Sequence, residues 1–251
     1  MRKARLKAVV LPNGNFGYVN EQGEQAFEHE FLGVRPFSNN GLAVVVFLDG
    51  GTGCINEEGK VVCWAGFSWI ESFSDNGLAA VVFLNGNTGY INEQGKKAFT
   101  AEFDWAHSFS NNGIAAVRFL NGKAGYIDKQ GEKIFETEFE RACPFSNNGL
   151  AAVIFLNDNG QKLGCYINGR GEKASTAEFL EVESFSDNGL AAVKLLNGNF
   201  AYINEQGENA FGAEFLEIEK FSDGMATVKF LNGRQGSISE QGEVLAVRGV
   251  F

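Results

Sequence analysis

Short apolar runs separated by glycine-containing turns follow one another along the chain. Leu78–Leu84 is an apolar run rich in valine, which is typical of a buried strand. Asn85 and Gly86 tolerate the positive φ of a tight hairpin turn, and Gly89–Asn92 is a second short run after it. The pattern therefore predicts a β-hairpin over residues 78–92.

Two further extended pieces follow this hairpin. Residues 93–95 read Glu-Gln-Gly, a turn with glycine at the left-handed position, so we expect a third strand to begin at Lys97–Phe99. Phe103–Phe109 predicts a fourth extended piece, which the glycine-containing turn at residues 110–113 closes. Because no segment carries a helical period, the pattern predicts an all-β fold of short antiparallel strands.

The same pattern returns about every 36 residues. Phe-Ser pairs begin at Phe37, Phe73, Phe109, Phe145, Phe185 and Phe221, and only the step from 145 to 185 is longer, at 40 residues. An insertion at Asp158–Leu163 accounts for that step. The predicted hairpin turns lie near Asn13, Asp49, Asn85, Asn121, Asn157, Asn197 and Asn232. We therefore expect a single domain, residues 1–251, of seven tandem antiparallel β-repeats.

A repeat of this size cannot bury its phenylalanine and leucine side chains alone, so neighbouring repeats must complete its core. Two arrangements achieve this: a closed seven-bladed, propeller-like ring, or an open β-solenoid or hairpin array. The sequence begins at the first long strand of a repeat and stops part-way through another. Because a propeller often completes its last blade from both ends of the chain, we expect the closed ring, with the open array as the alternative.

Four stretches of one repeat carry a family pattern: Gly125-Tyr126-Ile127-Asp128, Gly131, Phe139–Ala142 and Phe145–Val153. This pattern resembles the WG repeat family of bacterial proteins, also called KWG repeats. The chain departs from it in having tyrosine instead of tryptophan, an additional asparagine in most turns, and Cys54 and Ser237 in place of the aromatic residue. The resemblance implies a propeller-like β-repeat module of the interaction kind, and it implies no catalytic residue.

Composition narrows the classes of function. The 32 glycines and only 3 prolines fit hairpin turns built on glycine, and the 24 phenylalanines fit several framework rings per repeat. A net charge of −10 argues against a nucleic-acid partner, which requires a basic surface. No apolar run is long enough to cross a bilayer, and Ala8–Leu11 is too short for the centre of a signal peptide. We therefore expect neither nucleic-acid binding nor membrane insertion.

Few side chains suit metal binding or nucleophilic catalysis. The four cysteines occupy unrelated repeat positions, so we expect free, buried thiols and a reducing, cytoplasmic location: Cys54, Cys63, Cys143 and Cys165. His29 and His107 have no partner at metal-ligand spacing, so we expect surface histidines. These features predict no cofactor, no metal site and no enzymatic activity.

Positions that vary between otherwise similar repeats are candidates for specific binding. They flank the aliphatic centre of each phenylalanine-to-phenylalanine segment: Gly33 and Arg35, Trp69 and Glu71, Trp105 and His107, Arg141 and Cys143, Glu181 and Glu183, Glu217 and Glu219. Residues two apart on an extended strand share a face, so the pairs are expected to form one stripe across the repeats. Its aromatic and basic arc gives the candidate partner-binding residues: Trp69, Glu71, Trp105, His107, Arg141 and Arg35. The alternative is that the tryptophans only pack over neighbouring repeats.

Two functions fit these features. The first is a non-enzymatic interaction or scaffold module that binds a protein or peptide partner on a face of the repeat array. The second is a small-molecule or carbohydrate binder or enzyme with its site in a central channel, using tryptophan stacking and the carboxylates of the stripe. The remaining acidic residues, in the Glu-Gln-Gly and Ala-Glu-Phe turns, are expected to form a solvated rim. The pattern leaves the oligomeric state open.

Overall fold

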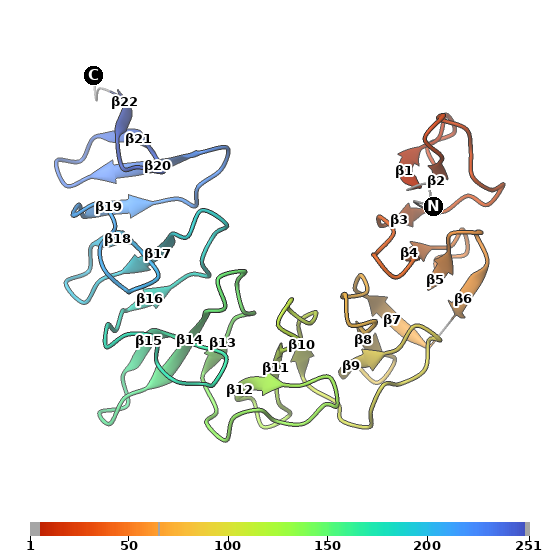
Figure 1. Ribbon diagram of the computed structural model, residues 1–251, viewed down its shortest axis with the longest axis horizontal. Coiled ribbons are helices and arrows are strands. Elements are labelled where there is room, and N and C mark those ends of the chain that lie inside the picture. Colours follow the sequence, from red (N-terminus) through yellow and green to blue (C-terminus); the bar gives the residue numbers. More distant parts are fainter. Residues whose placement is uncertain (1–5, 65, 249–251) are drawn as a thin grey trace. The chain divides into compact units, whose positions relative to one another are not determined.

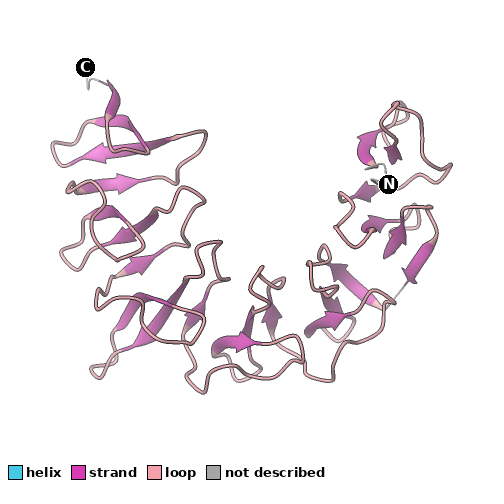
Figure 2. Cartoon of the chain, in the orientation of Figure 1, coloured by secondary structure: helices cyan, strands magenta, loops and turns pink. Residues whose placement is uncertain are grey.

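A computed structural model of the protein describes residues 6–64 and 66–248, and these residues form only strands, turns and loops (Figure 2). No helix that could span a membrane occurs in this part of the chain. The prediction of an all-β fold is confirmed. The chain divides into two compact units, the first from residues 1–122 and 126–134, the second from residues 123–125 and 135–251.

The strands of the first unit are short and pair in chain order. They are β1 (Lys7–Val10), β2 (Phe16–Val19), β3 (Gly33–Val34), β4 (Leu42–Val46), β5 (Thr52–Asn56), β6 (Val61–Trp64), β7 (Phe67–Ile70), β8 (Ala79–Phe83), β9 (Thr88–Ile91), β10 (Trp105–Ala106) and β11 (Ala115–Arg118). Their antiparallel sheets run β1-β2, β3-β4-β5-β6, β7-β8-β9 and β10-β11. The boundary between the units passes through β12 (Ala124–Ile127).

The second unit continues the same meander. Its strands are β13 (Arg141–Ala142), β14 (Ala151–Leu156), β15 (Lys162–Ile167), β16 (Glu181–Val182), β17 (Ala191–Lys194), β18 (Phe200–Ile203), β19 (Phe215–Ile218), β20 (Met225–Phe230), β21 (Gln235–Ser239) and β22 (Val244–Arg248). They form a β13-β14-β15 sheet and a seven-stranded sheet from β16 to β22, in which neighbours in the chain are neighbours in space (Figure 1).

The structure places a hairpin turn at each of the seven predicted positions. In the turn between β8 and β9, Gly86 N–H donates to the carbonyl of Phe83 at 2.9 Å, and Gly86 has a φ of +86°. That φ is readily adopted only by glycine, which explains why glycine recurs there. The insertion at Asp158–Leu163 lengthens β14 and β15 to six residues each, against five for β8 and four for β9.

The prediction of a third strand at Lys97–Phe99 is wrong. Lys97 makes only an isolated bridge with Ile91, after which the chain turns away. Residues 98–100 form a bend after this bridge, and the Phe99 ring packs under the main chain of Gly131 in the following repeat. A strand at this place occurs only in the repeat that contains β6 and in the one that ends with β22, among the described residues.

Main-chain bridges connect consecutive repeats within each unit. Phe16 and Phe31 exchange two N–H···O=C hydrogen bonds at 2.8 and 2.9 Å, which tie one hairpin to the next segment. The equivalent bridge joins Gly164 to Phe179 in the second unit. The predicted fourth extended piece therefore exists, and its first phenylalanine links two repeats.

One disulfide contradicts the prediction of four free thiols. Cys54 on β5 and Cys63 on β6 face each other in the antiparallel register with their Cα atoms 5.0 Å apart, and they form a disulfide. Sequence spacing alone did not reveal this pairing, because it depends on β6 forming beside β5. Cys143 and Cys165 are free and buried, as predicted.

Candidate interaction surface

A buried tyrosine occupies the same position in five repeats: Tyr18, Tyr90, Tyr126, Tyr166 and Tyr202. The hydroxyl groups of Tyr18 and Tyr90 donate to the carbonyls of Arg35 and His107, each at 2.6 Å. Tyr166 donates in the same way to Glu183, and Tyr202 to Glu219. Burial raises the pKa of these four phenols, so the hydroxyl group remains a donor. Each of the four holds a main-chain atom, which leaves the side chain at that position free to vary.

Arg35, Trp69 and Glu71 lie together in the first unit, although the sequence separates Arg35 from the other two by one repeat. The Arg35 guanidinium donates to the Glu71 carboxylate at 2.9 Å. Its Cζ atom also lies 5.3 Å from the centroid of the Trp69 ring, within cation–π range. Variable positions of consecutive repeats are therefore direct neighbours here.

Trp105 and His107 form a second pair in the same unit. Their ring centroids are 3.8 Å apart with the planes at 80°, an edge-to-face contact. Trp105 is 46% exposed and Trp69 is 43% exposed, so both indoles face solvent. These tryptophans occupy the same place in consecutive repeats, on β10 and β7.

In four of the six pairs the first variable position is more exposed than the second, whereas Gly33 and Arg35 are both half-buried and Glu217 and Glu219 are both exposed. The first position is exposed at Trp69, Trp105, Arg141, Glu181 and Glu217. The second position is half-buried at Arg35, Glu71, His107 and Glu183, and Cys143 is fully buried. The prediction that both residues of every pair share an exposed face is therefore wrong at Cys143. Cys143 belongs to the core cluster that contains Tyr166 and Val182, because its small apolar side chain is stable away from solvent.

Three of the four stripe carboxylates in the second unit are paired with lysines. Glu181 pairs with Lys194 at 3.1 Å, Glu183 with Lys220 at 3.1 Å and Glu217 with Lys229 at 2.7 Å. Such exposed pairs contribute little to stability, but they remove the uniformly acidic arc that the sequence suggested.

Part of the expected acidic rim holds hairpins in place. In the turn between β8 and β9, the side-chain amides of Asn85 and Asn87 donate to the Glu102 carboxylate at 3.0 and 2.8 Å. Lys97 and these two amides lower the pKa of Glu102 to about 2. The same arrangement recurs at Glu30 and Glu214. These glutamates accept hydrogen bonds from the asparagines of the hairpin turns, whereas we expected freely solvated side chains.

Sequence reasoning did not single out Trp64. It is 54% exposed on β6, and its ring stacks on Phe47 with the centroids 4.2 Å apart. A signal was present, because this repeat has cysteines, Cys54 and Cys63, at the positions of Tyr90 and Phe99. Trp64 lies outside the variable stripe and therefore serves below as a control.

Comparisons with known proteins place these features in context. The family model described as "WG containing repeat" matches residues 16–50, 53–87, 89–123, 125–158, 166–200 and 200–234. The search of curated proteins gave no match. Among solved structures, a eukaryotic initiation factor is similar with a TM-score of 0.62 and 11% identity, over 99% of this chain and 74% of that one. BamB from Moraxella catarrhalis has a TM-score of 0.44 and 14% identity, over 96% of this chain and 78% of that one. At these identities the similarity concerns the fold alone.

Proposed function

We propose that this chain, which belongs to the family of WG containing repeats, is a non-enzymatic interaction module that binds a protein or peptide partner. In the first unit the partner would contact Trp69 and Trp105 as anchors, with Arg35, Glu71 and His107 beside them. Arg141 is the candidate anchor in the second unit. Exposed tryptophans and arginines are typical anchors of protein interfaces. A nucleic-acid partner is not proposed, because the net charge is −10.

One observation carries this proposal. The tyrosine hydroxyl groups hold the carbonyls of the second variable positions, for example His107 under Tyr90. The frame is thereby fixed by the main chain, while the exposed side chains differ between repeats. Such a surface can change its specificity without changing its fold, which is how repeat proteins present binding faces.

A capture experiment with the purified full chain tests the proposal. Replacing Trp69, Trp105 and Arg141 together by alanine removes the exposed anchors and leaves the tyrosine anchors untouched. We expect recovery of the specific partner from lysate of the native cells to fall at least about tenfold, which is the effect of losing a hot spot. Circular dichroism melting should show an unchanged fold.

Trp64→Ala is the matched control, because it removes an equally exposed indole outside the stripe. Its capture should equal that of the unmodified chain. Equal capture by the triple variant and the unmodified chain would overturn the proposed surface. If Trp64→Ala loses as much capture as the triple variant, exposed indoles bind without regard to position. That result also contradicts the proposed surface.

A closed seven-repeat ring in one domain over residues 1–251 is the architecture that we propose for this module. The near-identical hairpins support the ring, since each repeat presents the same strands to the repeats on either side. The open array is the alternative, and the bridge between Phe16 and Phe31 is compatible with both, because each arrangement pairs neighbouring repeats. Small-angle scattering distinguishes the two: a ring gives a disc-like maximum dimension, and a markedly longer particle contradicts the ring.

We also propose a cytoplasmic location, which the free buried thiols of Cys143 and Cys165 support. The Cys54–Cys63 disulfide argues in the other direction, because disulfides persist mainly in oxidising compartments. Fractionation of native cells that express the tagged full chain decides between the two: recovery outside the cytoplasmic fraction overturns this location.

A further inference from the structure

The two halves of the chain differ in charge. Residues 135–251 carry 17 acidic and 9 basic side chains, whereas residues 1–134 carry 14 acidic and 12 basic ones. Most of the negative charge of the chain therefore lies in the part that forms the second unit. Because a surface of one sign attracts a partner of the opposite sign, the second unit is suited to a basic partner.

A hollow of about 250 Å³ lies on the variable stripe of the second unit. Its lining includes the apolar side chains of Val193, Phe200 and Ile218. It also includes the carboxylates of Glu183 and Glu219, which are the second variable positions of consecutive repeats. The volume is below the usual range for small-molecule sites, but a pocket of this size suits one anchor side chain of a partner.

The first unit shows which group fits between two such positions. Arg35 and Glu71 are the corresponding residues there, and the Arg35 guanidinium donates to the Glu71 carboxylate at 2.9 Å. In the second unit Glu183 stands where the first unit has Arg35, and Glu219 stands where it has Glu71. The acceptor of this contact is therefore kept, whereas the donor is replaced by a second carboxylate.

The lysines at this hollow leave one carboxylate without a counter-ion. Lys194 pairs with Glu181 and Lys220 pairs with Glu183, both at 3.1 Å. In the part of the chain that the structure describes, no basic side chain pairs with the exposed Glu219 carboxylate. The rim therefore carries three acidic and two basic groups, and a cationic side chain of a partner would balance it.

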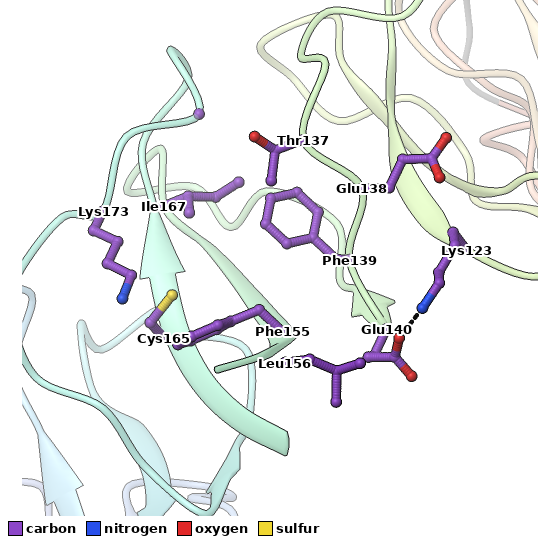
Figure 3. Close-up of a pocket in the computed structure, with 11 residues that line it drawn as sticks. Lys123, Thr137, Glu138, Phe139, Glu140, Phe155, Leu156, Cys165, Ile167 and Lys173 are labelled. Atoms are coloured by element: carbon purple, nitrogen blue, oxygen red, sulfur yellow. Dashed lines mark hydrogen bonds and ion pairs between the residues drawn. The ribbon is translucent and has the colours of Figure 1, made fainter. Parts of the chain in front are cut away.

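A larger hollow in the same unit, of about 350 Å³, has a different rim (Figure 3). Its Glu140 pairs with Lys123 and, at 3.3 Å, with Lys162. Its Lys173 pairs with Glu178 at 2.6 Å. These charges are balanced within the chain, so the larger hollow has no comparable reason to select a basic partner.

We propose that the hollow on the stripe binds an arginine side chain of a basic protein segment. The guanidinium faces Glu219, as Arg35 faces Glu71, and the aliphatic part of the side chain lies on Val193 and Ile218. Arginine suits this place better than lysine, because its planar guanidinium donates two parallel hydrogen bonds to a carboxylate. This inference rests on the proposed function, since it names the class of partner that the stripe would bind.

A titration with N-acetyl-arginine N-methylamide tests the site in the full chain labelled with ¹³C at the isoleucine methyl groups. Ile218 lines the hollow, so its methyl signal reports whether the hollow is occupied. We expect a saturable shift with a Kd on the order of 1 mM. The citrulline analogue has nearly the same shape without the charge and should bind about threefold more weakly or worse. No saturable shift up to about 10 mM of the arginine probe, or equal binding of the citrulline analogue, overturns the proposal.

Glu219→Gln keeps the size of the side chain and removes its charge, so it should weaken binding of the arginine probe about threefold to fivefold. Glu205→Gln is the matched control, because Glu205 is also exposed, lies in the same unit outside the hollow, and has no ion pair among the described residues. Its binding of the probe should be unchanged. Unchanged binding by Glu219→Gln contradicts the assignment, and so does an equal loss for Glu205→Gln, which would show a response to overall charge alone.

This inference and the proposed function can fail separately. If the triple variant loses capture of the partner while Glu219→Gln binds the arginine probe normally, the stripe is a binding surface and the arginine site is wrong. If Glu219→Gln weakens the probe while the triple variant captures its partner normally, the arginine site stands and the anchors assigned to the stripe are wrong.

Discussion

A single buried hydroxyl group determines how the surface above it can vary. Tyr90 is fully buried, and its hydroxyl group is a 2.6 Å donor to the carbonyl of His107. Tyr90→Phe leaves that carbonyl without this partner, so we expect the free energy of unfolding to fall by about 1–2 kcal/mol in urea denaturation. Tyr202→Phe should behave alike, since it has the same partner geometry at Glu219.

His107→Ala is the control at this scale, because it removes the side chain and keeps the carbonyl. Its effect on stability should be smaller than that of Tyr90→Phe. If His107→Ala costs more, the fold depends on the variable side chain, and the tyrosine anchor does not explain the variability of the stripe.

The candidate site was only partly predictable from its residues. Within-chain comparison identified Trp69 and Trp105 as variable positions, and the structure leaves both exposed. It could not show that Arg35 lies over Trp69, because that contact joins two repeats. Nor could it show that Cys143 turns inward, because that depends on the core cluster in which Cys143 packs.

At the scale of an element, the disulfide takes the place of an aromatic contact. Cys54 and Cys63 occupy the positions of Tyr90 and Phe99, whose rings lie 5.5 Å apart. Both positions change together in this repeat, and β6 is a full strand here. Ile70, on the strand that also carries Trp69, packs in the same core cluster as both cysteines. The bond therefore supports the element that presents the stripe.

Replacing the disulfide by an aromatic pair tests whether the two contacts stabilise the repeat equally. Cys54→Ser with Cys63→Ser should lower the free energy of unfolding by about 2–3 kcal/mol, as expected for a loop closed over nine residues. Cys54→Tyr with Cys63→Phe should recover most of that loss, because the ring contact replaces the bond. The melting temperature of the unmodified chain should fall when dithiothreitol is added, and that of the Tyr/Phe variant should not.

Either single substitution, Cys54→Tyr or Cys63→Phe, leaves half of the contact and is the control for additivity. If the double variant is no more stable than the sum of the two single changes predicts, the rings do not form the expected pair. The equivalence of bond and ring contact would then be wrong.

The presence of strands and hairpin turns was predictable from the sequence. Apolar runs and Asn-Gly turns located the hairpins, because those local patterns fix both the strand and its turn. The strand expected at Lys97–Phe99 failed for a non-local reason. Phe99 packs under Gly131 of the next repeat, and the chain bends away from the sheet after one bridge, a tertiary arrangement that the local pattern does not encode.

At the scale of the molecule, stability comes from repeats that complete one another. Phe27 packs under Gly59 of the next repeat in the first unit, and Phe211 under Gly242 in the second. In such chains, stability is approximately the sum of repeat and neighbour terms, so one blocked contact weakens coupling along the array. The contact between Phe99 and Gly131 allows that coupling to be measured within one unit.

Gly131 and Gly122 make a matched pair for this measurement. Both have a φ of +83°, so alanine strains the backbone equally, by about 1–2 kcal/mol. A Cβ atom at Gly122 meets open space, whereas one at Gly131 comes within 2.5 Å of the Phe99 ring. Gly131→Ala should therefore cost roughly 1–3 kcal/mol more than Gly122→Ala in urea denaturation, as overpacking does, and its transition should broaden as neighbouring repeats uncouple. Equal losses for the two variants would show that glycine is required there only by the turn, and that the repeats are held together by their main-chain bridges.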